Sequence, residues 1–492
     1  MKPATLKRIT RITAKVAVRV ATGIFLIVAT LLLAIAFGDR SMPDLHAWHE
    51  EIPDGEFRAR DLEPGFTLDD YLAIEEEVFS NLDAFMLSPD NIGGHSEAIR
   101  YVRGGFGDPE TFDRNWNRTF ELVPREIRGG VLLLHGLSDS PYSMRSFAES
   151  AHDQGYYVLA IRLPGHGTVP ASLIRTRWTD WAAAIEVGAR HVAGKLADGQ
   201  RFVLGGYSNG GALAVRYTLQ SIDADDLPTP DRVFLLSPAI GITRVAMASN
   251  WHKLFSWIPY FEKSRWMSIQ PEYDPFKYNS FPKNAGAQSW AVARQVQAEI
   301  TRAEADGRLA RMPPIITFQS VVDSTIIASD IVDRLYRRLP ANGSELVIFD
   351  VNSVGVFDQF FRNRADRGFV GLGTDTTRRF RLTEIANASP ESDQVVARTS
   401  EPFSDEVTIV PLQLAWPKNV YSLAHVSLPF PPDDPLYGAV GTPGRANLGD
   451  LAPRGEKNVL NISAADLLRL RYNPFHEYMI QRIIELVPAA PQ

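Results

Sequence analysis

The stretch Phe202-Val203-Leu204-Gly205-Gly206-Tyr207-Ser208-Asn209-Gly210-Gly211 decides the fold of this chain. Its leading apolar residues predict a strand, its glycines predict a sharp turn, and the amphipathic residues from Ala212 to Gln220 predict a helix. Side chains at Gly206 and Gly210 would collide with the neighbouring strand or helix. The turn therefore lifts Ser208 out of the sheet, towards a base and two backbone N–H donors, and predicts a nucleophilic serine.

The composition bounds the class of protein. With 492 residues, of which 45% are hydrophobic, the chain can hold two or three average domains or one large α/β domain with insertions. It has no cysteine, which excludes disulfides, thiolate metal sites and lipid attachment through an N-terminal cysteine. The residues after position 40 include 44 of the 51 basic residues and 57 of the 58 acidic ones, which gives them a formal net charge of −13. Such an acidic body argues against nucleic acid as a partner.

The first forty residues combine a basic segment with an apolar run. The run from Val20 to Phe37 is uncharged over 18 residues, the lower limit for crossing a bilayer. Six cations precede it and favour a cytoplasmic N-terminus: Lys2, Lys7, Arg8, Arg11, Lys15 and Arg19. We therefore expect residues 1–40 to form a basic tail and a single-pass anchor in the inner membrane, with the rest exported. Ala34-Ile35-Ala36 also resembles a cleavage site, and the alternative is a secreted or periplasmic protein after signal cleavage.

The rest of the chain divides into an irregular part and a regular part. Residues 41–128 are polar and irregular, with one predicted helix at Leu68–Leu87, and indicate a stalk or a decorating N-terminal region. In residues 129–488, short apolar runs alternate with helical stretches, which predicts a mainly parallel sheet covered by helices on both faces. The expected strands are Val131–Leu134, Tyr157–Ile161, Phe202–Leu204, Val233–Leu236, Ile315–Phe318 and Leu346–Phe349. The expected helices are Tyr142–Gln154, Trp178–Leu196, Ala212–Gln220, Ile326–Leu339 and Ala464–Val487.

Two intervals interrupt this alternation. Residues 352–416 are polar and rich in Arg, Asp and Thr, with a strand-like run at Val407–Leu414. Residues 241–313 are instead dense in aromatic side chains. These are Trp251, Phe255, Trp257, Tyr260, Phe261, Trp266, Tyr273, Phe276, Tyr278, Phe281 and Trp290. Most of them are expected to form the core of this interval, and some to line an apolar pocket.

The loops that follow the first two expected strands hold histidines. His135-Gly136-Leu137 leaves the first strand, where the Leu137 N–H can form an oxyanion hole together with the Asn209 N–H. An ordinary turn with a hydrogen-bonded His135 is the alternative. His166, in the loop after the second strand, is interpreted as structural.

A serine nucleophile needs an imidazole base and a carboxylate that orients the imidazole. Asp323 comes just after an expected strand and is the favoured acid, although a residue there could also cap the next helix. Asp350 ends the next strand and is its rival, whereas Asp330 lies inside the expected helix.

For the base, His425 and His476 are the histidines that follow Asp323 in the chain. His476 falls inside the expected C-terminal helix, where a histidine is commonly a packing or surface residue. His425 lies in a loop before a proline-rich stretch, and it is the favoured base. The resulting chain order of Ser208, Asp323 and His425 is that of the α/β-hydrolase fold.

These motifs together resemble the α/β-hydrolases of the carboxylesterase and monoacylglycerol lipase group. The resemblance covers roughly Gly129 to Leu339 and resumes near Val420. It is carried by His135-Gly136-Leu137, Leu163-Pro164-Gly165-His166-Gly167, Gly206-Tyr207-Ser208-Asn209-Gly210-Gly211, Asp323 and His425. In this group a cap is inserted where residues 241–313 lie.

The resemblance implies a triad of Ser208, Asp323 and His425, with oxyanion donors at Leu137 and Asn209. We therefore expect a serine hydrolase of acyl or lipid-like carboxylic esters that works through an acyl-enzyme and needs no metal or organic cofactor. The same triad could transfer the acyl group to another alcohol or cleave thioesters or amides. A non-catalytic binding module at the membrane is the alternative from a different class.

Overall fold

The computed structural model describes residues 15–26, 30, 42–86, 88–241, 262–355, 369–441, 447–451, 462 and 464–487. Most of the expected anchor, Val20–Phe37, lies outside these residues, as do the possible cleavage site and the aromatic residues between positions 251 and 261. Among the helices of the described residues, none has both the length and the apolar character needed to cross a membrane.

One large sheet organises the described residues. Its ten strands follow the order β1-β3-β2-β4-β5-β8-β9-β10-β11-β12. All neighbours from β3 through β10 are parallel, whereas β1, β11 and β12 pair antiparallel at the two edges. The strands are β1 (Phe120–Leu122), β2 (Gly129–Leu134), β3 (Tyr156–Ile161), β4 (Arg201–Tyr207), β5 (Arg232–Leu236), β8 (Ile315–Ser320), β9 (Glu345–Phe349), β10 (Arg381–Asn387), β11 (Gln394–Ser400) and β12 (Thr408–Ala415). The expected mainly parallel sheet and its six expected strands are confirmed.

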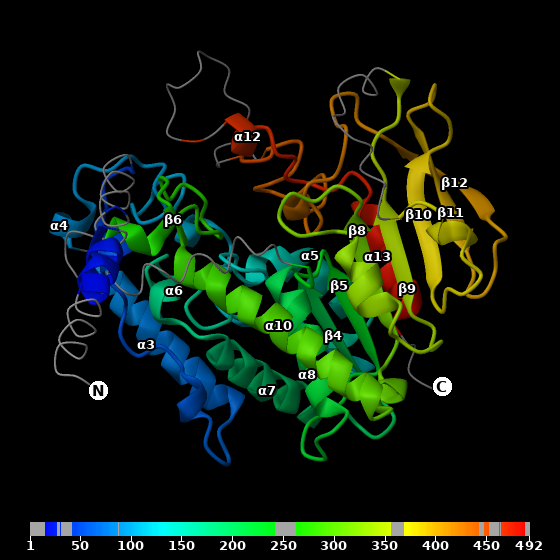
Figure 1. Ribbon diagram of the computed structural model, residues 1–492, viewed down its shortest axis with the longest axis horizontal. Coiled ribbons are helices and arrows are strands. Elements are labelled where there is room, and N and C mark those ends of the chain that lie inside the picture. Colours follow the sequence, from blue (N-terminus) through cyan, green and yellow to red (C-terminus); the bar gives the residue numbers. More distant parts are fainter. Residues whose placement is uncertain are drawn as a thin grey trace, which may run out of the picture.

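Helices cover both faces of this sheet. Helices α3, α7, α8 and α10 lie side by side on one face, and α5 and α13 pack on the other (Figure 1). The longer helices are α3 (Leu68–Met86), α5 (Arg145–Asp153), α7 (Trp178–Gly194), α8 (Asn209–Ser221), α10 (Lys283–Ala305) and α13 (His476–Leu486). Single turns are α2 (Ala47–Glu50), α4 (Pro89–Ile92), α6 (Ser172–Arg175), α12 (Ala464–Leu467), η1 (Ala59–Asp61), η2 (Pro109–Thr111), η3 (Pro141–Met144), η6 (Lys263–Arg265), η7 (Arg308–Arg311), η8 (Val332–Tyr336), η10 (Leu372–Thr374) and η11 (His425–Ser427).

Strand β2 shows how the sequence creates the two covered faces. Leu132 and Leu134 pack into the core beneath α7 and α8, whereas Val131 and Leu133 pack into the core beneath α5. All four are fully buried. Because successive side chains of a strand point to opposite faces, a strand buried on both sides is apolar at every position. Each such side chain contributes about 1.5–3 kcal/mol to folding.

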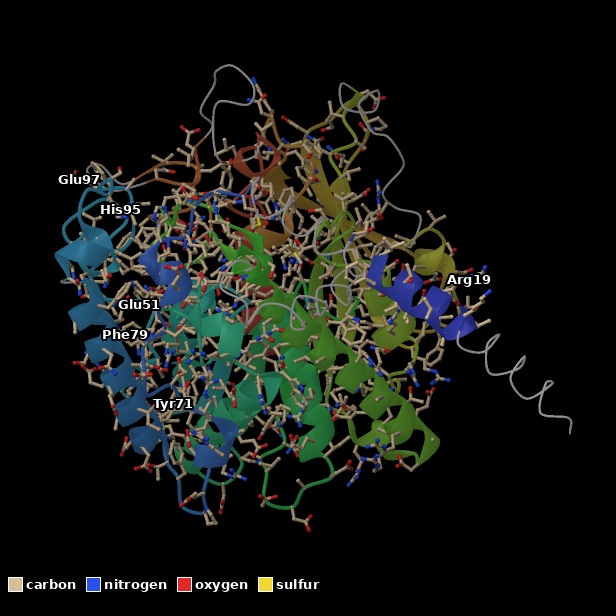
Figure 2. The ribbon with its side chains drawn as sticks, turned by 60° about the vertical axis from the view of Figure 1, so that its left-hand side comes forward. Arg19, Glu51, Tyr71, Phe79, His95 and Glu97 are labelled. Carbon is tan, nitrogen blue, oxygen red and sulfur yellow. The ribbon has the colours of Figure 1, made fainter. Side chains whose placement is uncertain are left out.

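The N-terminal region packs closely against the domain and does not form a stalk. Tyr71 and Phe79 of α3 are buried, and Figure 2 shows this helix running along one side of the molecule. The predicted helix at Leu68–Leu87 is confirmed by α3. At its end, this region adds β1 to the edge of the sheet beside β3.

The polar interval 352–416 extends the same sheet. Strands β10, β11 and β12 continue it beyond β9, and the strand predicted at Val407–Leu414 is β12 (Figure 1). The aromatic interval 241–313 also divides into two parts. Residues 262–282 form loops and a small sheet of β6 (Trp266–Ser268) and β7 (Phe281–Pro282), whereas α10 packs on α8 within the helical layer.

Two predicted helices are shorter than expected. In the interval Ile326–Leu339, helical residues begin only at position 330, because the Asp323 carboxylate accepts the Thr325 and Ile326 N–H groups and fixes a local turn. The predicted C-terminal helix is broken between α12 and α13. Pro474 lies in this break, where it restricts the preceding residue to extended conformations.

Candidate active site

Ser208 occupies the strained turn between β4 and α8. Its backbone angles are φ 53° and ψ −115°, a conformation that costs a residue with a side chain about 1–3 kcal/mol. The surrounding chain holds this conformation: the Ser208 N–H donates to the Leu236 carbonyl at 2.9 Å, and the Ala239 N–H donates to the Ser208 carbonyl at 2.9 Å. The serine is thus fixed at the carboxyl end of β4, with its side chain beyond the end of the strand.

The glycines around Ser208 allow the turn to pack. A Cβ at Gly206 would overlap the backbone of Gly210 and Gly211, and a Cβ at Gly210 would overlap the Leu134 carbonyl at the end of β2. The predicted steric role of both glycines is confirmed. A helix therefore starts directly above two strands, which places the first N–H groups of α8 beside the serine.

Three side chains from distant parts of the chain form a continuous hydrogen-bonded chain. His425 Nε2 lies 2.9 Å from Ser208 Oγ, and His425 Nδ1 lies 2.7 Å from Asp323 Oδ2. Since a carboxylate can only accept, Nδ1 carries the proton, and Nε2 is left to accept the serine O–H. The side chains of Asp323 and His425 are 0% and 3% exposed, so the bond between them is shielded from water.

The local backbone keeps Asp323 ionised. Burial raises the pKa of this carboxyl, but the His425 ring and the Thr325 and Ile326 N–H groups outweigh burial, and the pKa lies below its ordinary value. The two N–H groups bind Oδ1 at 2.8 and 3.1 Å, which directs Oδ2 towards His425. Gln319 also donates to Oδ2, at 3.3 Å.

The loop that carries His425 is held by two hydroxyl groups that the sequence did not single out. Ser320, the last residue of β8, donates its O–H to the Leu423 carbonyl at 3.0 Å. The Tyr207 hydroxyl donates to the carbonyl of His425 itself at 3.4 Å. Tyr207 is the last residue of β4 and Ser320 is the last residue of β8, so both lie at the carboxyl ends of the strands, where Ser208 also lies. In the sequence, only the presence of a hydroxyl residue at the end of a strand could have indicated this positioning role. Such residues are too common at strand ends to identify a role.

Leu137 lies in the loop that leaves β2, and Asn209 begins α8. Among the hydrogen bonds of the described residues, neither backbone N–H has a protein acceptor. His135 fixes the loop: its Nδ1 is 2.9 Å from the Gly136 carbonyl, and the Leu163 N–H donates to its Nε2 at 2.9 Å. Burial lowers the pKa of His135 well below its ordinary value. His135 is therefore the hydrogen-bonded structural residue of the alternative interpretation, and it orients the Leu137 segment.

The other candidates lie elsewhere. His166 is buried, its Nδ1 lies 3.1 Å from the Leu163 carbonyl, and burial lowers its pKa to about 4, as expected of a structural histidine. The Asp350 carboxylate accepts the N–H of Val351, and Asp330 pairs with Arg334. His476 is buried at the start of α13, where burial lowers its pKa to about 4. In the described part of the chain, no three or more His, Asp or Glu side chains gather as a metal site would require.

The comparisons with known proteins agree with this architecture. The model of the alpha/beta hydrolase family matches residues 131–358. A thermostable monoacylglycerol lipase of Bacillus sp. (strain H-257) is 40% identical over 86 residues, which are 18% of this chain and 33% of the relative. This chain thus spans about a third of the length of the curated relative that it matches.

Two solved structures are also similar. A chain from the metagenome-derived lipolytic enzymes LipS and LipT is 21% identical, with a TM-score of 0.37, and the match covers 48% of this chain and 87% of that one. The monoacylglycerol lipase of Paleococcus ferrophilus is 19% identical, with a TM-score of 0.35, over 47% of this chain and 88% of that one.

Proposed function

We propose that this protein hydrolyses carboxylic esters through a triad of Ser208, His425 and Asp323, since residues 131–358 match the model of the alpha/beta hydrolase family. The observation that carries the proposal is the hydrogen-bonded chain, in which Nε2 lies 2.9 Å from the serine oxygen and Nδ1 lies 2.7 Å from the carboxylate. The resemblance of an 86-residue segment to a monoacylglycerol lipase supports an acyl or lipid-like ester as substrate.

In the first half of the reaction, Ser208 Oγ attacks the ester carbonyl while His425 Nε2 takes the serine proton. The ring becomes an imidazolium, which the Asp323 carboxylate stabilises and keeps in one orientation. The N–H groups of Leu137 and Asn209 bind the oxyanion of the tetrahedral intermediate, and each such donor is worth about 3 kcal/mol. His425 then gives the proton to the leaving alcohol, which departs and leaves an acyl group on Ser208.

In the second half, water replaces the alcohol. His425 takes a proton from water, the hydroxide attacks the acyl carbonyl, and the same two N–H groups bind the new oxyanion. The intermediate collapses, His425 returns the proton to Ser208, and the carboxylic acid leaves. Every proton that moves in this cycle passes through His425 Nε2, so the reaction needs no group beyond the triad and the two donors.

The test combines covalent labelling with turnover. A fluorophosphonate probe should label the wild-type protein and the control Ser96→Ala, which changes an exposed serine of the N-terminal region, but not Ser208→Ala. The same wild-type and control proteins should release p-nitrophenol from p-nitrophenyl butyrate. Labelling that persists in Ser208→Ala would overturn the assignment of the nucleophile. Product analysis with a competing alcohol, and a thioester substrate, would identify acyl transfer or thioester cleavage instead.

We also propose that residues 1–40 anchor the protein in the inner membrane, with a cytoplasmic N-terminus and an exported hydrolase domain. The uncharged run of 18 residues and the six cations before it support this location. Membrane fractionation with external protease digestion of spheroplasts should find the domain membrane-bound and accessible. A mature N-terminus directly after Ala36 would instead indicate secretion.

A further inference from the structure

A cavity of about 330 Å³ opens beside the candidate active site. Its wall includes Ser138, the residue after the oxyanion donor Leu137, and Val426, the residue after His425. A cavity of this size is at the lower end of the range of about 300–1,000 Å³ that is typical of small-molecule sites. A substrate whose carbonyl sits over Ser208 would therefore extend one end into it.

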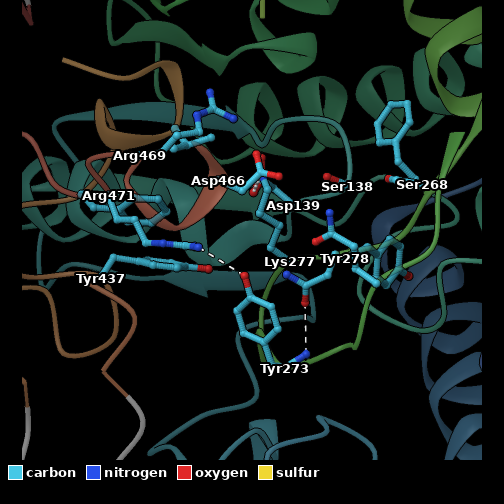
Figure 3. A pocket seen from close by; sticks show the side chains of 15 residues that line it. Ser138, Asp139, Ser268, Tyr273, Lys277, Tyr278, Tyr437, Asp466, Arg469 and Arg471 are labelled. Carbon is cyan, nitrogen blue, oxygen red and sulfur yellow. Dashed lines mark hydrogen bonds and ion pairs between the residues drawn. The ribbon is translucent and has the colours of Figure 1, made fainter. Parts of the chain in front are cut away.

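The cavity is more polar than the apolar pocket that some aromatic residues of the interval 241–313 were expected to line. Aromatic side chains do form much of the lining: Tyr273, Tyr278, Phe281, Phe430 and Tyr437. Between them, however, lie three cations, Lys277, Arg469 and Arg471, against two carboxylates, Asp139 and Asp466. Figure 3 shows the two arginines on one side of the cavity and Lys277 beside Asp139.

The cations differ in how they are neutralised. Lys277 forms an ion pair with Asp139 at 2.8 Å, and its charge is balanced. In the part of the chain that the structure describes, no ion pair includes either arginine. The guanidinium of Arg471 donates to the Tyr273 hydroxyl at 3.3 Å, and that of Arg469 donates to the Thr325 hydroxyl at 3.2 Å. Among the described residues, the side-chain hydrogen-bond partners of both arginines are thus neutral hydroxyl groups, and each guanidinium has further N–H groups that can bind an anion.

The setting of Arg471 favours a charged guanidinium with a fixed position. Burial lowers its pKa, but Tyr273, Asp274 and Tyr437 outweigh burial, and the pKa lies above its ordinary value. Asp274 itself is fully buried and accepts the Tyr437 hydroxyl at 2.7 Å. Asp274 is therefore engaged by Tyr437, and Arg471 lines the cavity.

We propose that the preferred substrate is an ester that carries an anionic group, a carboxylate or a phosphate, and that Arg471 and Arg469 bind this group in the cavity. The proposal rests on the esterase function above and names its substrate class. The aromatic side chains contact the carbon chain between the ester and the anion, and the oxyanion donors hold the carbonyl. Esters of the same length without the anion bind through apolar contacts alone.

Two matched pairs of substrates test the proposal. The first pair compares mono-p-nitrophenyl glutarate, which carries an anion on the acyl side of the ester, with the neutral p-nitrophenyl butyrate. 1-Butyrylglycerol 3-phosphate against 1-butyrylglycerol places it on the alcohol side. The wild-type protein should have the higher kcat/KM for the anionic member of at least one pair, and the pair that responds identifies the side of the ester that enters the cavity.

The variants show whether the arginines cause the preference. Arg471→Gln and Arg469→Gln should each reduce the anionic-to-neutral ratio of kcat/KM about tenfold, the usual effect of losing one charge-assisted hydrogen bond. Arg471→Lys should keep much of it. Arg302→Gln, an exposed arginine of α10, is the control and should keep the full ratio. A thermal melt identifies any variant that is misfolded, and the remaining arginine variant then carries the test.

Equal kcat/KM values within both pairs, or a preference that both glutamine variants retain, would overturn the proposal while leaving the esterase function intact. Failure of the esterase function has a different signature. In that case the wild-type protein would cleave neither member of either pair, and Ser208→Ala would behave like the wild type.

Discussion

Two buried ionic clusters lie beyond strand ends of the same sheet. Each pairs a basic side chain with carboxylates, but the two clusters have different roles. Around Arg162, after β3, the guanidinium pairs with Glu56 at 2.9 Å and with Glu75 at 3.0 Å. Around His425, the imidazole pairs with Asp323 at 2.7 Å. The side chains of both clusters are at most 6% exposed.

The clusters differ in whether a hydrogen-bonding group remains available for a reaction after the bonds within each cluster have formed. In the Arg162 cluster, Glu75 also accepts the Thr119 N–H and hydroxyl, and Glu56 accepts the Gly165 N–H, so the carboxylates are saturated. In the His425 cluster, one ring nitrogen faces the movable proton of a serine. A saturated cluster fixes two segments of the chain to each other, whereas an unsaturated one can take up and release a proton.

The largest expected effect comes from the unsaturated cluster. Asp323→Asn should lower kcat by about 10⁴-fold, because an amide in place of the carboxylate favours the wrong tautomer of His425. The variant keeps the shape of the residue, and we expect its urea unfolding midpoint to stay close to that of the wild type. Turnover of p-nitrophenyl butyrate and urea denaturation measure the two quantities. A variant that retains a tenth or more of the wild-type kcat would contradict the role of Asp323.

The saturated cluster should show the opposite pattern. Arg162→Leu leaves two buried carboxylates without their counter-charge, which should lower the free energy of unfolding by about 3–5 kcal/mol. Activity per folded molecule should fall far less than in Asp323→Asn. Chemical denaturation, with Arg302→Gln as a surface control, measures the loss. If Arg162→Leu were as stable as this control, the N-terminal region would not be fixed to the domain through this cluster.

Another buried carboxylate, Glu272, differs from those of both clusters, since no ion pair of the described residues includes it. It lies in the loops of residues 262–282, where burial raises its pKa to about 7 although the Asn279 and Ser280 N–H groups act to lower it. A carboxyl whose pKa is higher in the folded than in the unfolded chain contributes stability that is complete below the unfolded pKa of 4.5 and is lost as the pH rises through about 7.

The free energy of unfolding should therefore decrease between about pH 5 and pH 8, and by up to about 3 kcal/mol from this residue alone. Glu272→Gln cannot ionise and should lack this part of the decrease. Urea denaturation of both proteins across this pH range gives the difference. Parallel pH profiles for the two proteins would show that Glu272 is ionised in the folded chain throughout.

The sequence predicted the parts of the fold that depend on local patterns. Parallel strands buried on both faces are continuous apolar runs, such as Val131–Leu134, and were all found. Strands β10 and β11 were missed because charged residues such as Arg381 and Glu384, which are only partly buried, interrupt their apolar residues, so neither strand is a continuous apolar run. The break before α13 depended on a single proline, which the amphipathic pattern on either side obscured.

The candidate site was predictable for a related reason. Each of its side chains follows a strand or starts a helix, and the carboxyl ends of parallel strands meet at one edge of a sheet. The residues that position the site or fix the N-terminal region were not predictable, since Ser320 bonds to the carbonyl of Leu423, 103 residues later, and Glu56 pairs with Arg162, 106 residues away. Such contacts depend on how loops fold back over the sheet, and no local pattern in one sequence encodes them.

The smallest expected effect separates the two late histidines. His476 is buried at the start of α13, and burial lowers its pKa to about 4, so it is neutral at the pH of an esterase assay. His476→Ala should leave kcat/KM within about twofold of the wild type, whereas His425→Ala should reduce kcat as severely as loss of the nucleophile does. The turnover of p-nitrophenyl butyrate is measured for both alanine variants. Because each variant lacks one imidazole, a difference between them reflects the position of the histidine that was removed. A severe loss in His476→Ala, with its unfolding midpoint unchanged, would transfer the role of base to α13 and leave the 2.9 Å contact between His425 and Ser208 without a catalytic role.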